Sequence, residues 1–235
     1  MNCPPTGFAP SADFLCGLNP PSFPRSPAQV QFRPDGGQLI VTVKGTNTIY
    51  VFPVDKNGRL DNPTITQAPG PALPTDFAVA FDKHGTMLVT EPFGSATTIP
   101  TGGAGALSSF KVTNAGDAVS ISSHVGDGGT AACWIALEPS TGQYAYVSNN
   151  LSVSISSYSV GTDGSVTLLA GIAATASGPN DFAAAQEAGT SFLYVLEAGN
   201  GTIGAFQINL SDGSLTPLPM GIGMPAIAAT GIAAY

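Results

Sequence analysis

A repeat of roughly 50 residues is the feature that most constrains how this chain folds. Four units align, and they begin at Pro27, Pro74, Ala132 and Pro179. Each unit has a short run of small residues, a run rich in β-branched and aromatic residues, a strictly alternating run and a final strand after a glycine turn. Because one such unit cannot cover its own apolar faces, the repeat predicts four similar units stacked against one another.

The third and fourth runs of each unit are predicted to form a hairpin. In the first unit, Ile49 and Val51 alternate with Tyr50 and Phe52, the period expected of a strand. The residue pairs before the fourth run are Asn57-Gly58, Ala115-Gly116, Asp163-Gly164 and Asp212-Gly213. Three of these four are the Asn-Gly or Asp-Gly pairs that favour type I′ turns, so we expect type I′ hairpins here.

These patterns predict an all-β fold, a β-propeller of four-stranded antiparallel blades, in one domain over residues 1–235. The predicted blades lie at about 27–70, 71–122, 129–172 and 178–220. Hydrophobic residues make up 43% of the chain and charged residues 9%, which excludes a disordered chain. The 29 glycines and 20 prolines suit many tight turns rather than helices. A two-sheet sandwich is the alternative, but it would not need a fixed repeat.

The two ends of the chain depart from the repeat. Residues 225–235 resemble the first strand of a further blade, and residues 1–26 form an extension with one outer strand near Phe14. The start has neither the charged nor the apolar region of a signal peptide. Four blades and two single strands predict an open arc with uncovered apolar end faces. We therefore expect a chain that self-associates through these faces or is only marginally stable.

The charge content narrows the classes of binding partner, and the cysteine content limits the possible disulfides. Fifteen acids against seven basic residues give a net charge of −8, without the basic cluster that nucleic acids or anionic membranes attract. The three cysteines, Cys3, Cys16 and Cys133, leave at least one unpaired, and Cys3 with Cys16 could form a local bridge. Sequons at Asn150, Asn200 and Asn209 favour a secreted, glycosylated protein, so we expect an extracellular location.

The strand order of a propeller predicts which polar residues share one end of the blades. Of the two histidines, it places His124 at the end where second strands finish and His84 at the opposite end; Arg33 and Arg59 also fall at the opposite end. Each functional assignment has a non-functional alternative. The residue is then a solvated loop residue, a turn cap or, for Cys133, a small buried side chain. The residues predicted at the functional end are Arg25, Lys44, Asp76, Glu91, His124, Asn149, Asp181 and Glu197.

The third and fourth units resemble a known family. The stretches CWIALEPSTGQYAYVSNN, SISSYSV and DGSVTLL, then GPNDFAAA, SFLYVLEAGNGTIGAFQI and DGSLTPL, are similar to those of lactonase-type seven-bladed propellers, which include 6-phosphogluconolactonase-like and carboxymuconate-lactonising proteins. The resemblance covers roughly residues 25–235 and corresponds to the C-terminal two-thirds of such a propeller. It implies a small-molecule substrate, a carboxylated lactone or sugar-acid derivative, and hydrolase or lactonising isomerase chemistry.

Lactone hydrolysis needs a base that activates water and donors that hold the oxyanion. We assign His124 or Glu91 as the base. Arg25 and Lys44 are assigned to a carboxylate or oxyanion, and Asp76, Asn149, Asp181 and Glu197 to the rest of the substrate. No cofactor or metal is predicted, and a calcium site made of Glu91, Asn149 and Asp181 is the alternative. A propeller that binds a partner or glycan without catalysis is the second hypothesis.

Overall fold

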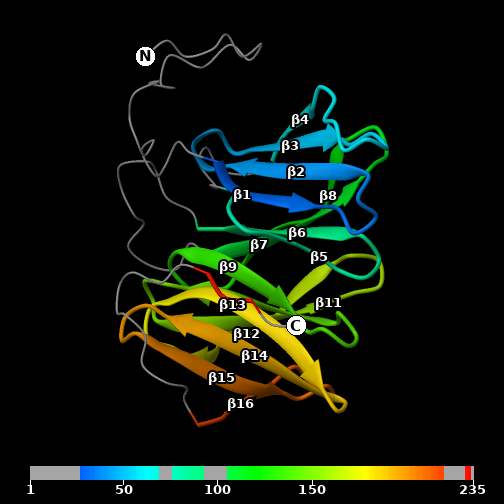
Figure 1. The fold of residues 1–235 in the computed structure, drawn as a ribbon. Helices are drawn as coiled ribbons and strands as arrows, with labels where there is room; N and C mark the ends of the chain where they lie inside the picture. Colours follow the sequence, from blue (N-terminus) through cyan, green and yellow to red (C-terminus); the bar gives the residue numbers. More distant parts are fainter. Residues whose placement is uncertain (1–26, 69–75, 93–104, 220–230, 234–235) are drawn as a thin grey trace.

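The computed structural model describes residues 27–68, 76–92, 105–219 and 231–233 of the chain. Four antiparallel four-stranded sheets follow one another along the sequence, each with its strands in chain order. Arg25, Cys3, Cys16 and the strand predicted near Phe14 lie outside the described residues. Figure 1 shows the four sheets one after another from the first (blue) to the last (orange).

The first two sheets contain β1 to β8 and one short 3-10 turn. The first sheet is β1 (Pro27–Phe32), β2 (Gln38–Val43), the turn η2 (Lys44–Thr46), β3 (Thr48–Pro53) and β4 (Thr64–Gln67). The second sheet is β5 (Val79–Phe81), β6 (Thr86–Glu91), β7 (Ala106–Val112) and β8 (Ala118–Gly126).

The last two sheets contain β9 to β16. The third sheet is β9 (Ala132–Leu137), β10 (Tyr144–Asn149), β11 (Ser154–Val160) and β12 (Val166–Thr175). The fourth sheet is β13 (Pro179–Glu187), β14 (Thr190–Glu197), β15 (Thr202–Ile208) and β16 (Leu215–Pro217). No α-helix occurs in the described ranges, and accordingly no helix there is long and apolar enough to cross a membrane.

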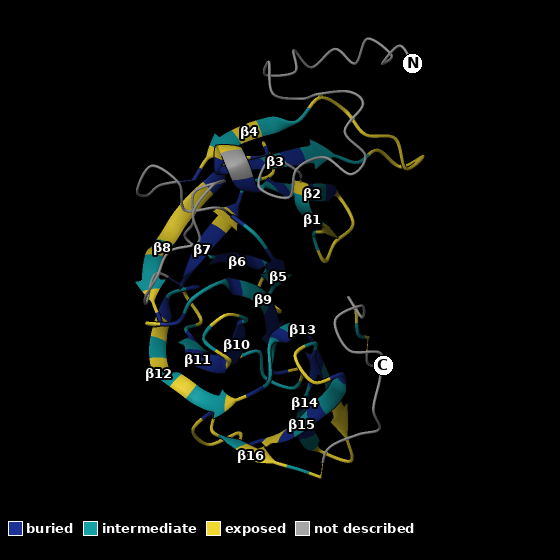
Figure 2. Ribbon diagram, turned by 90° about the vertical axis from the view of Figure 1, so that its left-hand side faces the viewer, coloured by how far each residue is buried: buried dark blue, intermediate teal, exposed yellow. Residues whose placement is uncertain are grey.

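The sheets stand around an arc with their first strands inside. Strand β1 contacts β5, β5 contacts β9, and β9 contacts β13, while β8 and β12 run along the outside (Figure 2). Each pair of neighbouring sheets encloses one buried apolar cluster. Ile40, Val51 and Phe110 belong to the first cluster, and Leu88 and Val147 belong to the second. The third cluster, between the last two sheets, includes Tyr146, Ile155 and Phe182.

Each sheet therefore has two faces with different neighbours. Along β6, Met87 and Val89 pack in the cluster shared with the first sheet, whereas Leu88 packs in the cluster shared with the third. This alternation is the period of two along a strand, applied to a sheet that is covered on both sides. We call the face toward the preceding sheet the incoming face and the face toward the following sheet the outgoing face.

Hydroxyl groups also join neighbouring sheets. Thr42 Oγ1 donates a hydrogen bond to the Phe77 carbonyl at 2.6 Å, and Thr90 Oγ1 donates to the Cys133 carbonyl at 3.2 Å. Both threonines occupy the last but one position of a second strand, and both acceptors precede or begin the first strand of the next sheet. The same hydroxyl contact therefore joins the first sheet to the second and the second to the third.

The prediction of type I′ turns between third and fourth strands is wrong. In the third sheet the Gly164 N–H bonds the Gly161 carbonyl, the Gly161 N–H bonds the Ser165 carbonyl, and only Gly164 has a positive φ, of 83°. This is a type I turn followed by a left-handed glycine bulge. The first and second sheets repeat it at Gly58 and Gly116. The glycines were read correctly as turn residues, but the turns contain more residues than a type I′ hairpin.

Candidate functional site

One position of the repeat carries a polar side chain in three of the four sheets. The last residue of each second strand pairs with the first residue of the third strand, as Glu91 pairs with Ala106. The residues at this position are Val43, Glu91, Asn149 and Glu197. They lie at the same end of their sheets, and Lys44 directly follows the first of them. His84 lies in the β5–β6 turn at the opposite end, as the strand order predicts.

Glu91 and His124 come together in the second sheet. His124 lies in an irregular stretch of the outer strand β8, where its φ of 52° is left-handed. Its Nδ1 hydrogen-bonds Glu91 Oε2, across the intervening strand β7. Ser108, on β7, also hydrogen-bonds the Glu91 carboxylate and accepts the His124 backbone N–H at 2.9 Å. These three hydrogen bonds fix one carboxylate oxygen of Glu91 and the backbone of His124.

The other edge of Glu91 faces a second buried carboxyl group. Glu91 and Asp76 are both fully buried, and Asp76 lies close enough to Glu91 for the two charges to repel. Glu91 Oε1 and both carboxyl oxygens of Asp76 have no hydrogen-bond partner among the described residues. Buried polar atoms are almost always satisfied in proteins, so three unsatisfied oxygens on adjacent side chains mark a place prepared for other donors.

Burial changes the protonation of both carboxyl groups. It raises the pKa of Asp76 to about 8, with the Glu91 charge adding to the effect, so Asp76 is protonated at neutral pH. Burial also raises the pKa of Glu91, while the hydrogen bonds from Ser108 and His124 and the charge of His124 oppose that rise. The pair therefore consists of Asp76, which keeps its proton, and Glu91, whose pKa is raised by burial and lowered again in part by the contacts with Ser108 and His124.

Lys44 is a buried cation that directly follows β2 and contacts the second sheet. Its Nζ lies 5.1 Å from the centre of the Phe77 ring, a cation–π distance, and Phe77 directly follows Asp76. Burial lowers the Lys44 pKa, and the nearby Cys133 opposes that change. Burial also raises the pKa of the Cys133 thiol to about 11, which keeps it protonated and unreactive.

The remaining predicted residues make contacts of their own. Asn149 Nδ2 donates to Ser156 Oγ at 2.7 Å. Asp181 accepts the Phe182 and Ile232 N–H groups at 2.7 and 3.1 Å. Glu197 accepts hydrogen bonds from Asn200 and Thr202 within its own sheet.

The predicted ring of polar residues is therefore divided. Asp76, Glu91 and His124 lie in or beside the second sheet, and Lys44 contacts it through Phe77, whereas Asn149 belongs to the third sheet and Asp181 and Glu197 belong to the fourth. Arg25 cannot be placed, because it lies outside the described residues. No group of three or more His, Cys, Asp or Glu residues in the described part of the chain is arranged to hold a metal ion.

Ser108 is the functional residue that the sequence interpretation missed. The third strands of the second and third units read ALSSFKV and SISSYSV, so Ser108 aligns with Ser156. Ser156 binds Asn149 in the third sheet as Ser108 binds Glu91 in the second. The repeated Ser-Ser pair in the third strands is the sequence signal that could have revealed these hydrogen bonds to Glu91 and Asn149.

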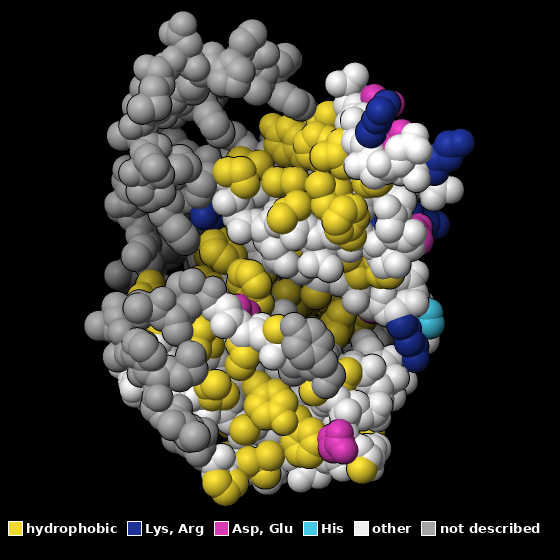
Figure 3. Space-filling model, viewed as in Figure 1, with side chains coloured by type: hydrophobic (Ala, Val, Ile, Leu, Met, Phe, Trp, Pro, Cys, Tyr) yellow, Lys and Arg dark blue, Asp and Glu magenta, His cyan; other side chains and the backbone are white. Residues whose placement is uncertain are grey.

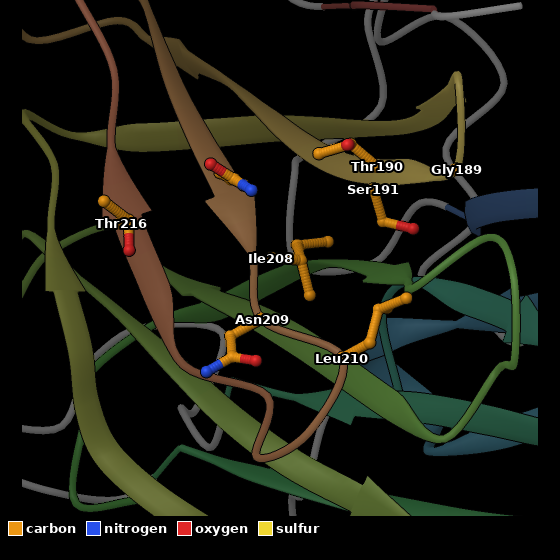
Figure 4. Close-up of a pocket in the computed structure, with 8 residues that line it drawn as sticks. Gly189, Thr190, Ser191, Ile208, Asn209, Leu210 and Thr216 are labelled. Atoms are coloured by element: carbon orange, nitrogen blue, oxygen red, sulfur yellow. The ribbon is translucent and has the colours of Figure 1, made fainter.

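A hollow of about 350 Å³ lies at the opposite end of the fourth sheet (Figure 4). It is lined by residues of the β13–β14 and β15–β16 turns and of the adjoining strands, among them Thr190, Ser191, Asn209 and Thr216. None of its lining residues titrates near neutral pH, so it offers hydrogen bonds but no acid–base chemistry.

Four-stranded antiparallel sheets arranged around an arc, with each first strand innermost, define a β-propeller. The family model described as Lactonase, 7-bladed beta-propeller matches residues 27–229, and the chain belongs to this family. No curated protein sequence matches the chain.

Solved structures show the same fold. A candidate 6-phosphogluconolactonase from Bacteroides fragilis superposes with a TM-score of 0.64 at 21% identity, over 87% of this chain and 56% of its own. The periplasmic gluconolactonase of Pseudomonas aeruginosa gives a TM-score of 0.60 at 16% identity, over 87% of this chain and 58% of its own. The chain thus spans a little over half the length of these structures, about what four blades of seven would give.

Proposed function

We propose that this propeller hydrolyses a small lactone at the cluster of Asp76, Glu91 and His124. The observation that carries the proposal is the pair of fully buried, adjacent carboxyl groups with three unsatisfied oxygens. Membership in the lactonase family supports it, as do the lactonase names of the structural neighbours. The substrate class is a carboxylated or phosphorylated sugar lactone, for which Lys44 supplies the positive charge.

The two carboxyl groups divide the chemistry between them. Glu91 Oε1 accepts a proton from water while the water oxygen attacks the lactone carbonyl carbon. Protonated Asp76 first donates a hydrogen bond to the oxyanion and then gives its proton to the ring oxygen as the ring C–O bond breaks. The products are a hydroxyl group and a carboxylic acid, which releases its proton to solvent and becomes a carboxylate, while Glu91 returns the proton that it took from water to the adjacent Asp76. The same groups run in reverse would form a lactone.

His124 acts as a positioning residue in this mechanism. Its Nδ1 occupies Glu91 Oε2, which leaves Oε1 as the oxygen directed to water. Because His124 lies on the outer strand β8, Glu91 on β6 lies between His124 and the innermost strand of the sheet. Both carboxyl groups are buried in this state, so the proposal requires an opening toward solvent when substrate enters.

A lactone-hydrolysis assay tests the proposal. Purified protein is given 6-phosphoglucono-δ-lactone, glucono-δ-lactone and a muconolactone, and ring opening is followed by proton release. Glu91→Gln should lower kcat at least 100-fold, because an amide cannot accept the proton. Glu187→Gln, a change of an exposed carboxylate on β13, is the matched control and should leave the rate unchanged.

The assay also separates the two hypotheses drawn from the sequence. Turnover that Glu91→Gln does not reduce places the chemistry elsewhere on the chain. Absence of turnover with all three lactones, together with binding of one of them by calorimetry, would favour a propeller that binds without catalysis.

An extracellular location remains a prediction. Asn200 and Asn209 are exposed, and Asn150 is half-buried with its Nδ2 donating to the Pro179 carbonyl at 3.3 Å. We therefore expect glycans at Asn200 and Asn209 before Asn150. Expression in a secreting eukaryotic host, followed by enzymatic removal of N-glycans, should lower the apparent mass by two glycans.

A further inference from the structure

A second group of buried, unsatisfied oxygens lies between the second and third sheets. Asn149, the last residue of β10, is fully buried, and Asp127, in the connection from β8 to β9, is only 5% exposed. Asn149 Oδ1 and Asp127 Oδ2 are both buried without a hydrogen-bond partner. Because buried polar atoms are almost always satisfied, these two oxygens need an occupant that the described residues do not supply.

This group is separate from the Asp76–Glu91 pair. Glu91 follows Val89 by two positions on β6 and shares its side of the strand, toward the first sheet. Asn149 follows Val147 by two positions on β10 and shares its side, from the third sheet toward the second. The two groups therefore lie on opposite faces of the second sheet.

Two glycines bring the backbone directly against Asp127 and Asn149. A Cβ on Gly105 would lie 2.7 Å from Asp127 Oδ1 and 3.1 Å from Asn149 Oδ1. A Cβ on Gly129 would overlap the Asn149 amide, and the Gly129 N–H donates to Asp127 Oδ1 at 2.7 Å. The carboxylate and the amide oxygen thus meet in a narrow cradle that a Cβ would fill. A space of this kind favours an ion or a water molecule over an organic ligand.

A hydrogen-bond chain fixes which end of the Asn149 amide faces Asp127. Ser156 Oγ donates to the Gly171 carbonyl at 2.8 Å. A serine hydroxyl has a single proton, so Ser156 can only accept from Asn149, whose Nδ2 lies 2.7 Å away. The amide therefore presents its oxygen to Asp127. Two acceptors then face each other, and only a cation or a donor between them can satisfy both.

The described residues supply no positive charge or proton to Asp127 Oδ2. Lys44 lies at the same end of the sheets, but its Nζ lies over the Phe77 ring. Tyr158 is near enough to Asp127 for its pKa to respond to that charge, yet its hydroxyl donates to the Val125 carbonyl at 3.0 Å. Figure 3 shows most of the visible Lys and Arg side chains at the opposite end, on the right of the view. The basic residues at that opposite end are Arg33, Lys56, Arg59, Lys83 and Lys111.

The repeat explains why this position differs from the second sheet. The hydroxyl contacts between sheets align Ala132 with Asp76, and Asn149 occupies the position of Glu91. The second sheet thus has two acids here, and one of them keeps its proton. In the third sheet Asp127 provides the single carboxylate, and an amide oxygen cannot hold a proton for it. A cation from solution is the occupant that neutralises this arrangement.

We propose that Asp127 and Asn149 bind a calcium ion between the second and third sheets. Asp127 Oδ2 and Asn149 Oδ1 are its protein side-chain ligands, and water completes the shell. Calcium takes carboxylate, amide and water oxygens in flexible geometry, whereas magnesium demands a near-ideal octahedron. A site with one carboxylate should be weak, with a Kd of about 0.1–1 mM. The site shares only Asn149 with the calcium site considered from the sequence, and it does not depend on lactone hydrolysis.

Calorimetry and thermal unfolding test the proposal on the full chain. The protein is treated with EDTA, dialysed and titrated with calcium chloride at constant ionic strength, and then with magnesium chloride. Asp127→Asn keeps the shape of the side chain but removes its charge, and Asn149→Asp adds a charge at the second ligand. Asp117→Asn, at an exposed residue of the β7–β8 turn, is the matched control. Circular dichroism verifies that each variant is folded.

We expect the wild type to bind one calcium ion, with a Tm about 3–6 °C higher at ten times the Kd. Asp127→Asn should weaken calcium binding at least 10-fold, and Asn149→Asp should strengthen it at least 10-fold. Asp117→Asn and Glu91→Gln should bind calcium as the wild type does.

Several results would overturn the proposal. No calcium binding by the wild type would leave a buried water as the donor between the two oxygens. Binding that Asp127→Asn does not weaken, or that Asn149→Asp does not strengthen, would place the ion elsewhere. Binding lost in Glu91→Gln would place it at the Asp76–Glu91 pair, and magnesium binding as tight as that of calcium would contradict the assignment of the ion.

Discussion

Asp76 couples the stability of this fold to pH. Its pKa of about 8 in the folded chain, against an ordinary value of 3.8, means that the folded state keeps a proton that the unfolded state releases. The contribution of Asp76 is therefore most favourable below about pH 4 and is lost as pH rises toward 8, by up to about 1.4 kcal/mol per pH unit.

Asp76→Asn should remove this dependence. Urea unfolding at pH 5 and pH 8 should show the wild type losing stability between the two, and the variant losing clearly less. At pH 8 the variant should be the more stable protein, since it has no charge to bury. Glu187→Gln serves as the control for an exposed carboxylate, and equal pH slopes for wild type and Asp76→Asn would show that Asp76 is charged when folded.

His124 makes a prediction that separates positioning from mere structural support. Asn tolerates the left-handed φ of 52° at this residue, so His124→Asn should fold. Without the imidazole, the Glu91 pKa should rise, because His124 lowers it. The acid limb of the pH–rate profile for lactone hydrolysis should then move to higher pH, with kcat reduced about 10- to 100-fold and KM little changed.

Ser123→Ala, a change at the exposed neighbour of His124, is the control for that experiment. If kcat falls with no shift of the profile, His124 supports the fold rather than the carboxylate. Strand order alone placed Glu91 and His124 at one end of their sheet. Their contact depends on the irregular pairing of β7 with β8 and on the left-handed backbone of His124, which no residue pattern indicates.

At the level of elements, Glu138 joins the third and fourth sheets. Its carboxylate accepts the Ser140 and Thr141 N–H groups at 2.6 and 2.7 Å and the Thr141 hydroxyl at 2.5 Å, all in the β9–β10 turn. It also accepts the Ser191 hydroxyl of β14 at 2.6 Å. Burial alone would raise its pKa, but these hydrogen bonds outweigh burial and lower the pKa to about 2.

Glu138→Gln should cost about 2–4 kcal/mol of unfolding free energy, because an amide cannot accept all four hydrogen bonds. Ser191→Ala removes only the bond between sheets and should cost about 1 kcal/mol. In the wild type, the contribution of Glu138 is present above about pH 4.5 and is lost as pH falls toward 2. Denaturant unfolding at pH 7 and pH 3 measures both; an equal cost for the two variants would mean that the bonds within the turn contribute nothing.

The strands were predictable because their signals are local, whereas register depended on loop length. The sequence motifs around Asp76 and Asp181 align, yet Val79 lies opposite Val89 while Phe182 lies opposite Val195. The β13–β14 loop has only Ala188 and Gly189, both with positive φ, while the β5–β6 turn is longer. With a shorter loop, the first strand is shifted along the second strand. Residues that align in sequence therefore pair with different positions of the second strand.

At the scale of the whole molecule, the number of sheets predicted more about the overall arrangement than any single site residue did. Four repeats in a family of seven-bladed rings predicted an arc, and the described sheets form one whose first and last members are not adjacent (Figure 2). The sequence could not show which residues of each strand lie toward the preceding sheet. That assignment depends on the phase of the alternation relative to the buried clusters, which is a property of the packed structure.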